Sequence, residues 1–252
     1  MPHQPMTKTS LLLLTSIALW LCMACSGRES GESEESEIAQ NPEMEENHYN
    51  EPRKLDYLAL GDSYTIGEGV PEELRWPNQL AERLSEFDID LSPVDIIATT
   101  GWTTRQLLDG IEAADPERHG LVSLLIGVNN QYRKQPFELY EREFGELLGI
   151  AIELAGGKQN VFVVSIPDYG VTPFGSGDPE GIGKEIDRYN THARKTCEEQ
   201  GIPFVDITGI SRELGDSPGA LAADRLHPSG SQYTRWTEAI LPVALELIRN
   251  RP

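Results

Sequence analysis

Five short apolar stretches recur along the chain from residue 54 onward. Within each of them Val, Ile, Leu and other apolar residues are nearly continuous, instead of alternating with polar ones. That pattern is typical of strands that are buried on both faces of a parallel sheet. The predicted strands cover residues 55–60, 94–98, 121–127, 161–166 and 203–208.

Segments with helical spacing of apolar residues separate these strands and follow the last one. They lie near residues 77–87, 103–114, 137–155, 184–200 and 231–249. Strands alternating with helices indicate a parallel sheet covered by helices on both faces. The sequence therefore predicts one α/β domain over residues 54–252, a three-layer α/β/α sandwich around a five-stranded parallel sheet.

The first 24 residues have the pattern of a signal peptide. Lys8 precedes an apolar run from Leu11 to Leu21, which is too short for a comfortable membrane span. Cys25 directly follows Ala24 and resembles the lipidated cysteine of a bacterial lipoprotein. We therefore expect an exported protein that is lipid-anchored at the cell envelope, at the outer membrane or surface; plain secretion and an uncleaved anchor are the alternatives.

Residues 25–53 are rich in Glu and Ser and nearly devoid of large apolar side chains. Such a segment cannot bury enough apolar surface to fold, and its like charges repel one another. We interpret it as a disordered acidic tether. If Cys25 carries lipid, the tether holds the domain away from the membrane.

The strongly negative charge of the chain argues against two classes of binding partner. The formal net charge of −20 leaves no basic surplus to neutralise phosphates, which argues against nucleic acid, and it disfavours electrostatic docking on anionic lipid. If Cys22 is removed with the signal peptide and Cys25 carries lipid, Cys197 has no partner for an intramolecular disulfide. We expect it to be a structural thiol.

Residues with reactive or hydrogen-bonding groups follow each predicted strand. Ser63 follows the first strand, Gly101 the second, Asn129 the third and Asp168 the fourth, and a longer loop after the fifth carries Asp224 and His227. In open parallel sheets, sites form at the carboxyl ends of the strands. We therefore expect these residues to meet at one edge of the sheet.

Ser63 is a weak nucleophile unless a base removes its proton. Of the five histidines, only His227 has both a carboxylate close in sequence and a place after a strand. Asp224, three residues before it, can accept a hydrogen bond from the imidazole and fix its tautomer. We interpret Ser63, His227 and Asp224 as nucleophile, base and orienting acid, whereas Asp62, adjacent to Ser63, fits a turn-stabilising role.

Acyl transfer also requires donors that face a developing oxyanion. The backbone N–H groups of Ser63 and Gly101 and the side chain of Asn129 are the candidates. For the substrate pocket the candidates are Trp102, Tyr132 and Asp168, together with Arg133, Tyr169 and Phe174, although a structural loop is an equally good interpretation of residues 166–175.

Four motifs in order, "GDSYTIG", "TTGWTTRQL", "IGVNN" and "DRLHP", resemble the blocks of the SGNH (GDSL-type) serine hydrolase family over nearly all of residues 54–252. Where the third block of that family often has Asp, this chain has Asn130. The resemblance implies a flavodoxin-like sandwich, serine esterase chemistry and no cofactor or metal. It assigns Ser63, Asp224 and His227 to catalysis and Ser63, Gly101 and Asn129 to the oxyanion hole.

We therefore expect a carboxylic ester hydrolase that forms an acyl-enzyme on Ser63 and acts, as a monomer, on small-molecule, glycan or lipid esters. The lack of a long hydrophobic insertion between strands favours short acyl groups or sugar esters. The alternatives are a lysophospholipase or other long-chain lipid esterase, and a non-catalytic surface binding module that retains the fold. A phosphate-binding loop lacks its motif here, and a metal hydrolase using Asp62, Asp224 and His227 is a further alternative.

Overall fold

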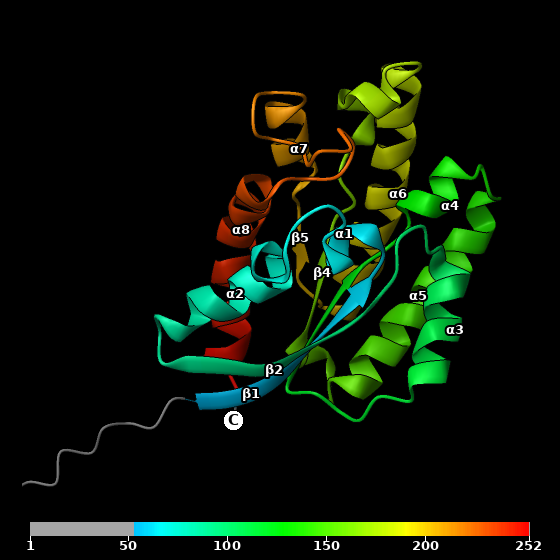
Figure 1. Ribbon diagram of the computed structural model, residues 1–252. Coiled ribbons are helices and arrows are strands. Elements are labelled where there is room, and N and C mark those ends of the chain that lie inside the picture. Colours follow the sequence, from blue (N-terminus) through cyan, green and yellow to red (C-terminus); the bar gives the residue numbers. More distant parts are fainter. Residues whose placement is uncertain (1–52, 252) are drawn as a thin grey trace, which may run out of the picture. The chain divides into compact units, whose positions relative to one another are not determined.

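The computed structural model describes residues 53–251. Its centre is a parallel sheet of five strands in the order β2-β1-β3-β4-β5 (Figure 1). The strands are β1 (Arg53–Gly61), β2 (Ile89–Ala98), β3 (Leu121–Leu125), β4 (Val161–Val164) and β5 (Phe204–Val205). The strand order reverses between β1 and β3, and ligands of such sheets bind at the carboxyl ends beside this point.

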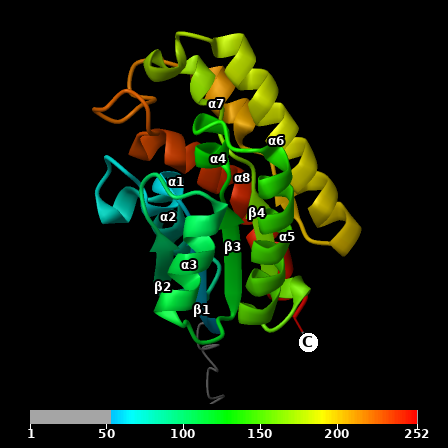
Figure 2. The same cartoon turned by 90° about the vertical axis from the view of Figure 1, so that its right-hand side faces the viewer.

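Helices cover both faces of the sheet. Helices α2 (Trp76–Ser85) and α8 (Gly230–Arg249) pack together on one face, and α3 (Thr104–Ala114), α5 (Phe137–Leu154) and α6 (Pro179–Gln200) cover the other (Figure 1). The shorter helices α1 (Ser63–Ile66), α4 (Val128–Tyr132) and α7 (Thr208–Leu214) lie at the carboxyl end of the sheet (Figure 2). The predicted three-layer α/β/α sandwich is confirmed.

Four single 3-10 turns complete the set of elements. They are η1 (Glu72–Leu74), η2 (Lys158–Asn160), η3 (Tyr169–Val171) and η4 (Pro173–Gly175).

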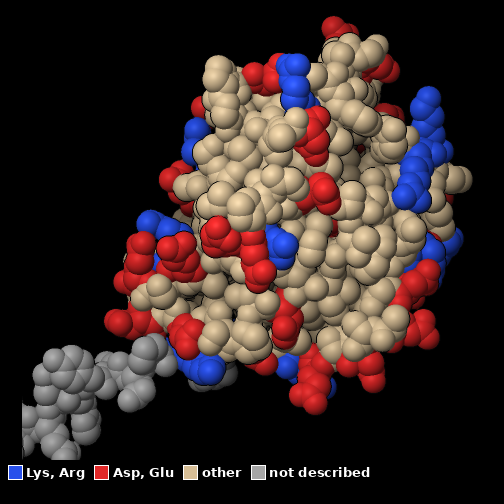
Figure 3. All heavy atoms as spheres, viewed as in Figure 1, with Lys and Arg blue, Asp and Glu red and all other residues tan. Residues whose placement is uncertain are grey.

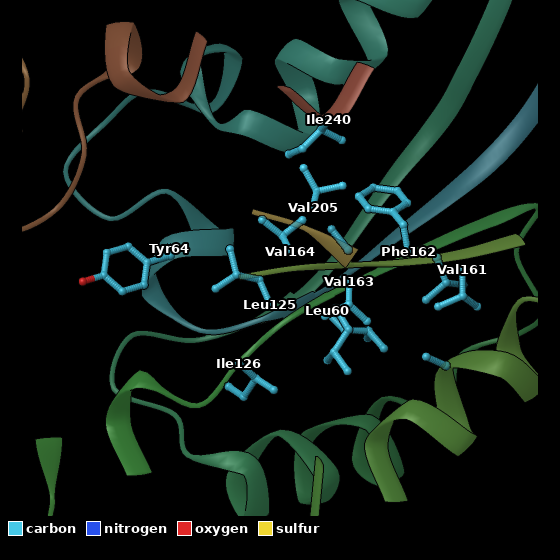
Figure 4. Packing of buried hydrophobic residues seen from close by; sticks show 14 of the residues in the cluster. Leu60, Tyr64, Leu125, Ile126, Val161, Phe162, Val163, Val164, Val205 and Ile240 are labelled. Atoms are coloured by element: carbon cyan, nitrogen blue, oxygen red, sulfur yellow. The ribbon is translucent and has the colours of Figure 1, made fainter. Parts of the chain in front are cut away.

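The core lies between the sheet and the helices. In Figure 4, Ile240 of α8 lies over Phe162, Val164 and Val205, whereas Ile126 lies on the other side of the sheet. Trp76 and Trp236, on α2 and α8, are fully buried. Burying such large apolar side chains is the main favourable contribution to folding, about 25 cal/mol per Å² of apolar surface.

The bounds of all five strands differ from the predicted ones, by one or two residues for β1, β3 and β4 and by more for β2 and β5. β2 begins at Ile89 instead of residue 94. The prediction missed its first five residues because polar side chains and Pro93 interrupt the apolar run there. β2 is an edge strand that pairs only with β1, and such residues are tolerated in an edge strand. β5 ends at Val205 instead of residue 208. Beyond it, the backbone N–H groups of Ile207 and Thr208 donate to the Ser165 hydroxyl oxygen at 2.8 and 3.1 Å instead of pairing with a neighbouring strand.

Helix α6 is longer than predicted, and the short helices α1, α4 and α7 were not predicted as helices. Helix α6 begins at Pro179 instead of residue 184, because the Asp178 carboxylate accepts a hydrogen bond from Gly181 N at 3.0 Å and Pro179 suits the first helical position. Helix α7 was predicted as the end of a strand and a loop. Its apolar residues are too few for a helical pattern to emerge from the sequence.

The N-terminal signal, Cys25 and the acidic tether lie outside the described residues. Within residues 53–251, no helix is long and apolar enough to cross a membrane. Acidic side chains are spread over the face seen in Figure 3, in keeping with the charge of the chain.

Candidate active site

A cavity of about 130 Å³ opens at the carboxyl ends of β1 and β3. Seven of the residues that the sequence singled out line it: Ser63, Gly101, Asn129, Tyr132, Tyr169, Phe174 and His227. They come from five separate segments of the chain. Of the residues expected to meet at one edge of the sheet, Ser63, Gly101, Asn129 and His227 do so around this cavity.

Ser63 is placed by the sharp turn from β1 into α1. Gly61 ends β1 so close to its neighbours that a Cβ there would lie 2.6 Å from the carbonyl oxygen of Leu125 on β3, and only glycine fits. Asp62 caps α1, and its Oδ1 accepts a hydrogen bond from the Tyr64 N–H at 3.0 Å. Ser63 follows as the first residue of α1 and is 4% exposed.

Asp62 has the side chain-to-backbone hydrogen bond that the sequence indicated. Its carboxyl is fully buried, and Oδ2 has no hydrogen-bond partner among the described residues. Burial raises its pKa to about 7, against the opposing effect of the Tyr64 N–H. Asp62 is therefore a turn residue with an unusual proton affinity, directly beside Ser63.

Asp224 holds His227 through both carboxylate oxygens. Oδ2 lies 2.5 Å from His227 Nδ1, and Oδ1 accepts the backbone N–H groups of Leu226 and His227 at 3.0 Å each. Burial alone raises the pKa of Asp224, but the hydrogen bonds from His227 and Leu226 outweigh it, so the net pKa is lowered. Because Nδ1 is engaged by a charged carboxylate, Nε2 is the ring nitrogen that can act in the cavity.

The loop that carries this pair is itself fixed. Leu221 and Pro228 form an antiparallel bridge, and Ala222 N donates to His227 O at 2.8 Å. The ring of Tyr64 meets the His227 ring edge-on, with 5.6 Å between centroids. The imidazole is thus held from the loop on one side and from α1 on the other.

Gly101 and Asn129 lie on two neighbouring loops of the cavity. Gly101 has a φ of +85°, in the region that favours glycine, and Arg133 Nη2 donates to its carbonyl oxygen at 2.6 Å. Asn129, in the first turn of α4, donates from Nδ2 to the carbonyl oxygen of Trp102 at 3.0 Å. This bond uses one of the two Nδ2 hydrogens.

Three of the predicted pocket residues, Trp102, Asp168 and Arg133, do not line the cavity, and these predictions need correction. The Arg133 guanidinium holds the Gly101 carbonyl instead. The indole of Trp102 packs against α3, so closely that a Cβ on Gly110 would lie 2.3 Å from the ring; only its backbone carbonyl reaches Asn129. Asp168 is buried in an ion pair with Arg212, Oδ2 to Nε 2.8 Å, and caps η3 through Gly170 N at 2.8 Å. A buried carboxylate is paired in this way because leaving it unpaired is costly.

Of the three pocket candidates after β4, Asp168 does not line the cavity, whereas the two aromatic residues do. Tyr169 and Phe174 line the cavity together with Tyr132, and the three rings contact one another: the Tyr132 centroid lies 6.2 Å from that of Tyr169 and 5.6 Å from that of Phe174, and the last two lie 6.2 Å apart. The sequence did not single out Tyr64, Thr100, Val128 and Leu226, which also line it. Each of these is next to a motif residue in the chain, which is the signal that could have revealed them.

No group of three His, Cys, Asp or Glu side chains suited to hold a metal ion occurs within residues 53–251. Cys197 is fully buried, as expected of a structural thiol, and burial raises its pKa to about 12.

The sequence matches the model of the GDSL-like lipase/acylhydrolase family over residues 59–235, more than half of the chain. The chain belongs to the GDSL-like lipase/acylhydrolase family. It is accordingly a hydrolase of carboxylic esters, and the family resemblance of the four motifs is confirmed. No curated protein was found to match the sequence.

Solved structures share the fold of this GDSL-like hydrolase. TesA has a TM-score of 0.61 and 19% identity, and the match covers 76% of this chain and 99% of that one. Axe2, an acetylxylan esterase from Geobacillus stearothermophilus, has a TM-score of 0.58 and 20% identity, with 80% and 100% covered. The psychrotrophic esterase EstA from Pseudoalteromonas sp. has a TM-score of 0.56 and 15% identity, with 77% and 99% covered.

Asn130 is the position at which this GDSL-like hydrolase departs from the frequent third motif. Its buried side chain accepts from Thr104 N at 3.0 Å and donates from Nδ2 to Thr104 Oγ1 at 2.6 Å and to Gln135 Oε1 at 3.0 Å. The Thr104 hydroxyl in turn donates to the buried carboxylate of Glu143 at 2.5 Å. An aspartate at position 130 would bring a second carboxylate to this network and lose two donors, so the amide fits it better.

Proposed function

We propose that this hydrolase cleaves esters through a covalent acyl-enzyme on Ser63. Ser63 Oγ forms a bond to the carbonyl carbon of the ester while His227 Nε2 takes the hydroxyl proton. The tetrahedral intermediate then collapses, the bond to the alcohol oxygen breaks, and His227 returns the proton to the leaving alcohol. Water, deprotonated by His227, then adds to the acyl carbon; the bond to Ser63 Oγ breaks, His227 returns the proton to Ser63 Oγ, and the acid is released.

Three donors are available for the oxyanion in this proposal. They are the N–H groups of Ser63 and Gly101 and the side-chain amide of Asn129. A single donor of this kind contributes roughly 10²–10³ in kcat. Asp224 keeps the imidazole in the productive tautomer and stabilises the imidazolium that forms.

The observation that carries the proposal is the convergence of Ser63, Gly101, Asn129 and His227 on one cavity, with Asp224 Oδ2 2.5 Å from His227 Nδ1. A binding module that merely retained the fold would have no need of this last contact. In a metal hydrolase, Asp62, Asp224 and His227 would have to bind one metal ion together. Asp62 would then have to turn toward the other two, but its Oδ1 accepts a hydrogen bond from the Tyr64 N–H.

Cavity size favours short acyl groups over long chains. An apolar cavity of about 150 Å³ accommodates one benzene molecule, and the present cavity, of about 130 Å³, is of comparable size. An acetyl or propionyl group fits such a space, whereas a long fatty acyl chain would have to leave it. The competing function is that of a lysophospholipase or long-chain lipid esterase.

A fluorophosphonate probe and p-nitrophenyl esters from C2 to C16 test both statements. We expect the wild type to be labelled at Ser63 and to turn over p-nitrophenyl acetate. Ser63→Ala abolishes labelling and turnover, whereas Ser85→Ala, an exposed serine on α2, changes neither. Equal turnover by wild type and Ser63→Ala would disprove the mechanism, and a maximum at C12 or longer would disprove the acyl preference.

We also propose that the protein is exported and lipid-anchored through Cys25, on the strength of the N-terminal sequence pattern alone. Metabolic labelling with an alkyne fatty acid tests this. Label lost in Cys25→Ala but retained in Cys197→Ala supports the anchor, and wild-type protein without label refutes it.

A further inference from the structure

A second, larger cavity adjoins the first. It measures about 620 Å³ and lies between α4 and α6, which contact each other. Tyr132 and Tyr169 line both cavities, so they stand at the junction between the small pocket beside Ser63 and this α4–α6 groove. An ester bond held at Ser63 therefore has a small space and a large one within reach.

The α4–α6 groove differs from the small cavity in chemistry as well as in size. Besides the two tyrosines it presents the amide side chains of Gln131 and Gln135, and charged groups on Lys134, Asp178, Lys184 and Glu185. The charged groups comprise two acids and two bases, so the groove as a whole favours neither an anion nor a cation. Ile182 and Tyr189 also line it, so the groove offers polar groups for the hydroxyls of a sugar and apolar surface for the C–H faces of its ring.

Tyr132 supplies a flat apolar surface at the junction. Its side chain is 53% exposed, and Phe174, beside it, is 52% exposed. Large exposed aromatic side chains that gather at a cavity often mark a binding site.

This aromatic surface is held in place by its neighbours. Tyr169 meets Tyr132 edge-on at 80°, and the Tyr169 hydroxyl donates to Gln131 Oε1 at 2.9 Å. The C–H groups on the face of a sugar ring carry partial positive charge and are attracted to the negative face of an aromatic ring. Tyr132 therefore offers a rigid stacking position for a sugar.

We propose that the α4–α6 groove binds the alcohol portion of the ester, a neutral oligosaccharide whose first sugar ring stacks on Tyr132 while its short acyl group enters the cavity beside Ser63. This inference rests on the proposed function and adds the class of alcohol to it. Gln131, Lys184 and Glu185 then provide hydrogen bonds to hydroxyl groups of the following sugars.

The test compares chemically acetylated β-linked glucose oligosaccharides of one to four units with p-nitrophenyl acetate. For the wild type, we expect kcat/KM per acetyl group to rise at least tenfold from the monosaccharide to the tetrasaccharide. Tyr132→Ala removes the stacking surface and Lys184→Trp obstructs the groove. In both, the ratio of tetrasaccharide ester to p-nitrophenyl acetate activity falls at least tenfold, whereas Phe87→Ala, an exposed aromatic on the α2–β2 connection, preserves it.

Failure of this inference is distinguishable from failure of the proposed function. Hydrolysis of p-nitrophenyl acetate with no dependence on sugar chain length, or a dependence that survives both variants, would overturn the groove alone. Absence of p-nitrophenyl acetate hydrolysis would refute the proposed function. In that case, titration of the wild type with unacetylated cellotetraose in a calorimeter still tests the groove: binding weakened at least tenfold in Tyr132→Ala supports it, and no binding overturns it.

Discussion

Arg133 Nη2 donates a hydrogen bond to the carbonyl oxygen of Gly101 at 2.6 Å. Arg133 follows α4, so this contact ties the loop after β3 to the loop after β2. The same guanidinium donates to Gln106 Oε1 at 3.2 Å. Gly101 is in the left-handed region, with a φ of +85°, and its orientation depends on what holds the loop.

Arg133 is therefore a positioning residue in the proposed mechanism. We expect Arg133→Leu to lower kcat about tenfold, which corresponds to about 1.4 kcal/mol of transition-state free energy, while KM changes less than kcat. Steady-state kinetics on p-nitrophenyl acetate measures both constants. The control is Arg83→Leu, an exposed arginine on α2 paired with Glu86. If KM rose and kcat were unchanged, Arg133 would serve binding instead.

Asp224→Asn should separate the orienting role from simple packing. The amide can donate to His227 Nδ1 and so favours the wrong tautomer of the imidazole. We expect kcat to fall by roughly 10²–10⁴ with little change in the melting temperature. Asp109→Asn, an exposed carboxylate on α3, is the control and should leave kcat unaltered. Activity within twofold of the wild type in Asp224→Asn would contradict the assignment.

Asp62 should make the folded protein less stable as the pH rises, the opposite of what a carboxyl with a lowered pKa does. Its folded-state pKa of about 7 lies above the ordinary value of 3.8, so between these values the folded protein holds a proton that the unfolded chain has released. The resulting stabilisation is complete below about pH 4 and is lost as the pH rises through about 7. In Asp62→Asn this dependence is absent.

Urea denaturation of the wild type and Asp62→Asn at pH 5, 6 and 8 measures the effect. The free energy of unfolding of the wild type, relative to that of the variant, should decrease steadily with rising pH. Asp56→Asn also removes a carboxylate that accepts a backbone N–H, from Gly120 at 2.7 Å, and should not abolish the trend. Parallel profiles for wild type and Asp62→Asn would show that Asp62 does not titrate in this range.

The ion pair of Asp168 and Arg212 should contribute to stability. The Asp168 carboxylate is 5% exposed, so Arg212→Ala leaves a nearly buried charge without its partner. We expect the free energy of unfolding to fall by about 2 kcal/mol. Arg235→Ala, which breaks exposed pairs with Glu213 and Glu238, should cost less than about 1 kcal/mol. A smaller loss for Arg212→Ala than for Arg235→Ala would refute this.

Local sequence patterns predicted the layers of the fold and located the site. The near-continuous apolar runs identified all five strands, because a strand covered on both faces needs apolar side chains on both. The same patterns failed at residues 89–93 and in helix α7, where an edge strand and a short helix have no apolar periodicity of their own. Strand ends marked the site because parallel strands bring their carboxyl ends to one edge.

What the sequence alone determined is the set of chemical groups and their order: a serine after the first strand, an asparagine after the third, and an aspartate three residues before a histidine. Only the tertiary structure decided which neighbours they meet. Trp102 and Asp168 follow strands like the others, but the Trp102 ring packs on Gly110 and the Asp168 carboxylate is paired with Arg212. The physical reason is that position along a strand specifies the edge a residue reaches, whereas the direction of its side chain depends on contacts with segments far away in the chain.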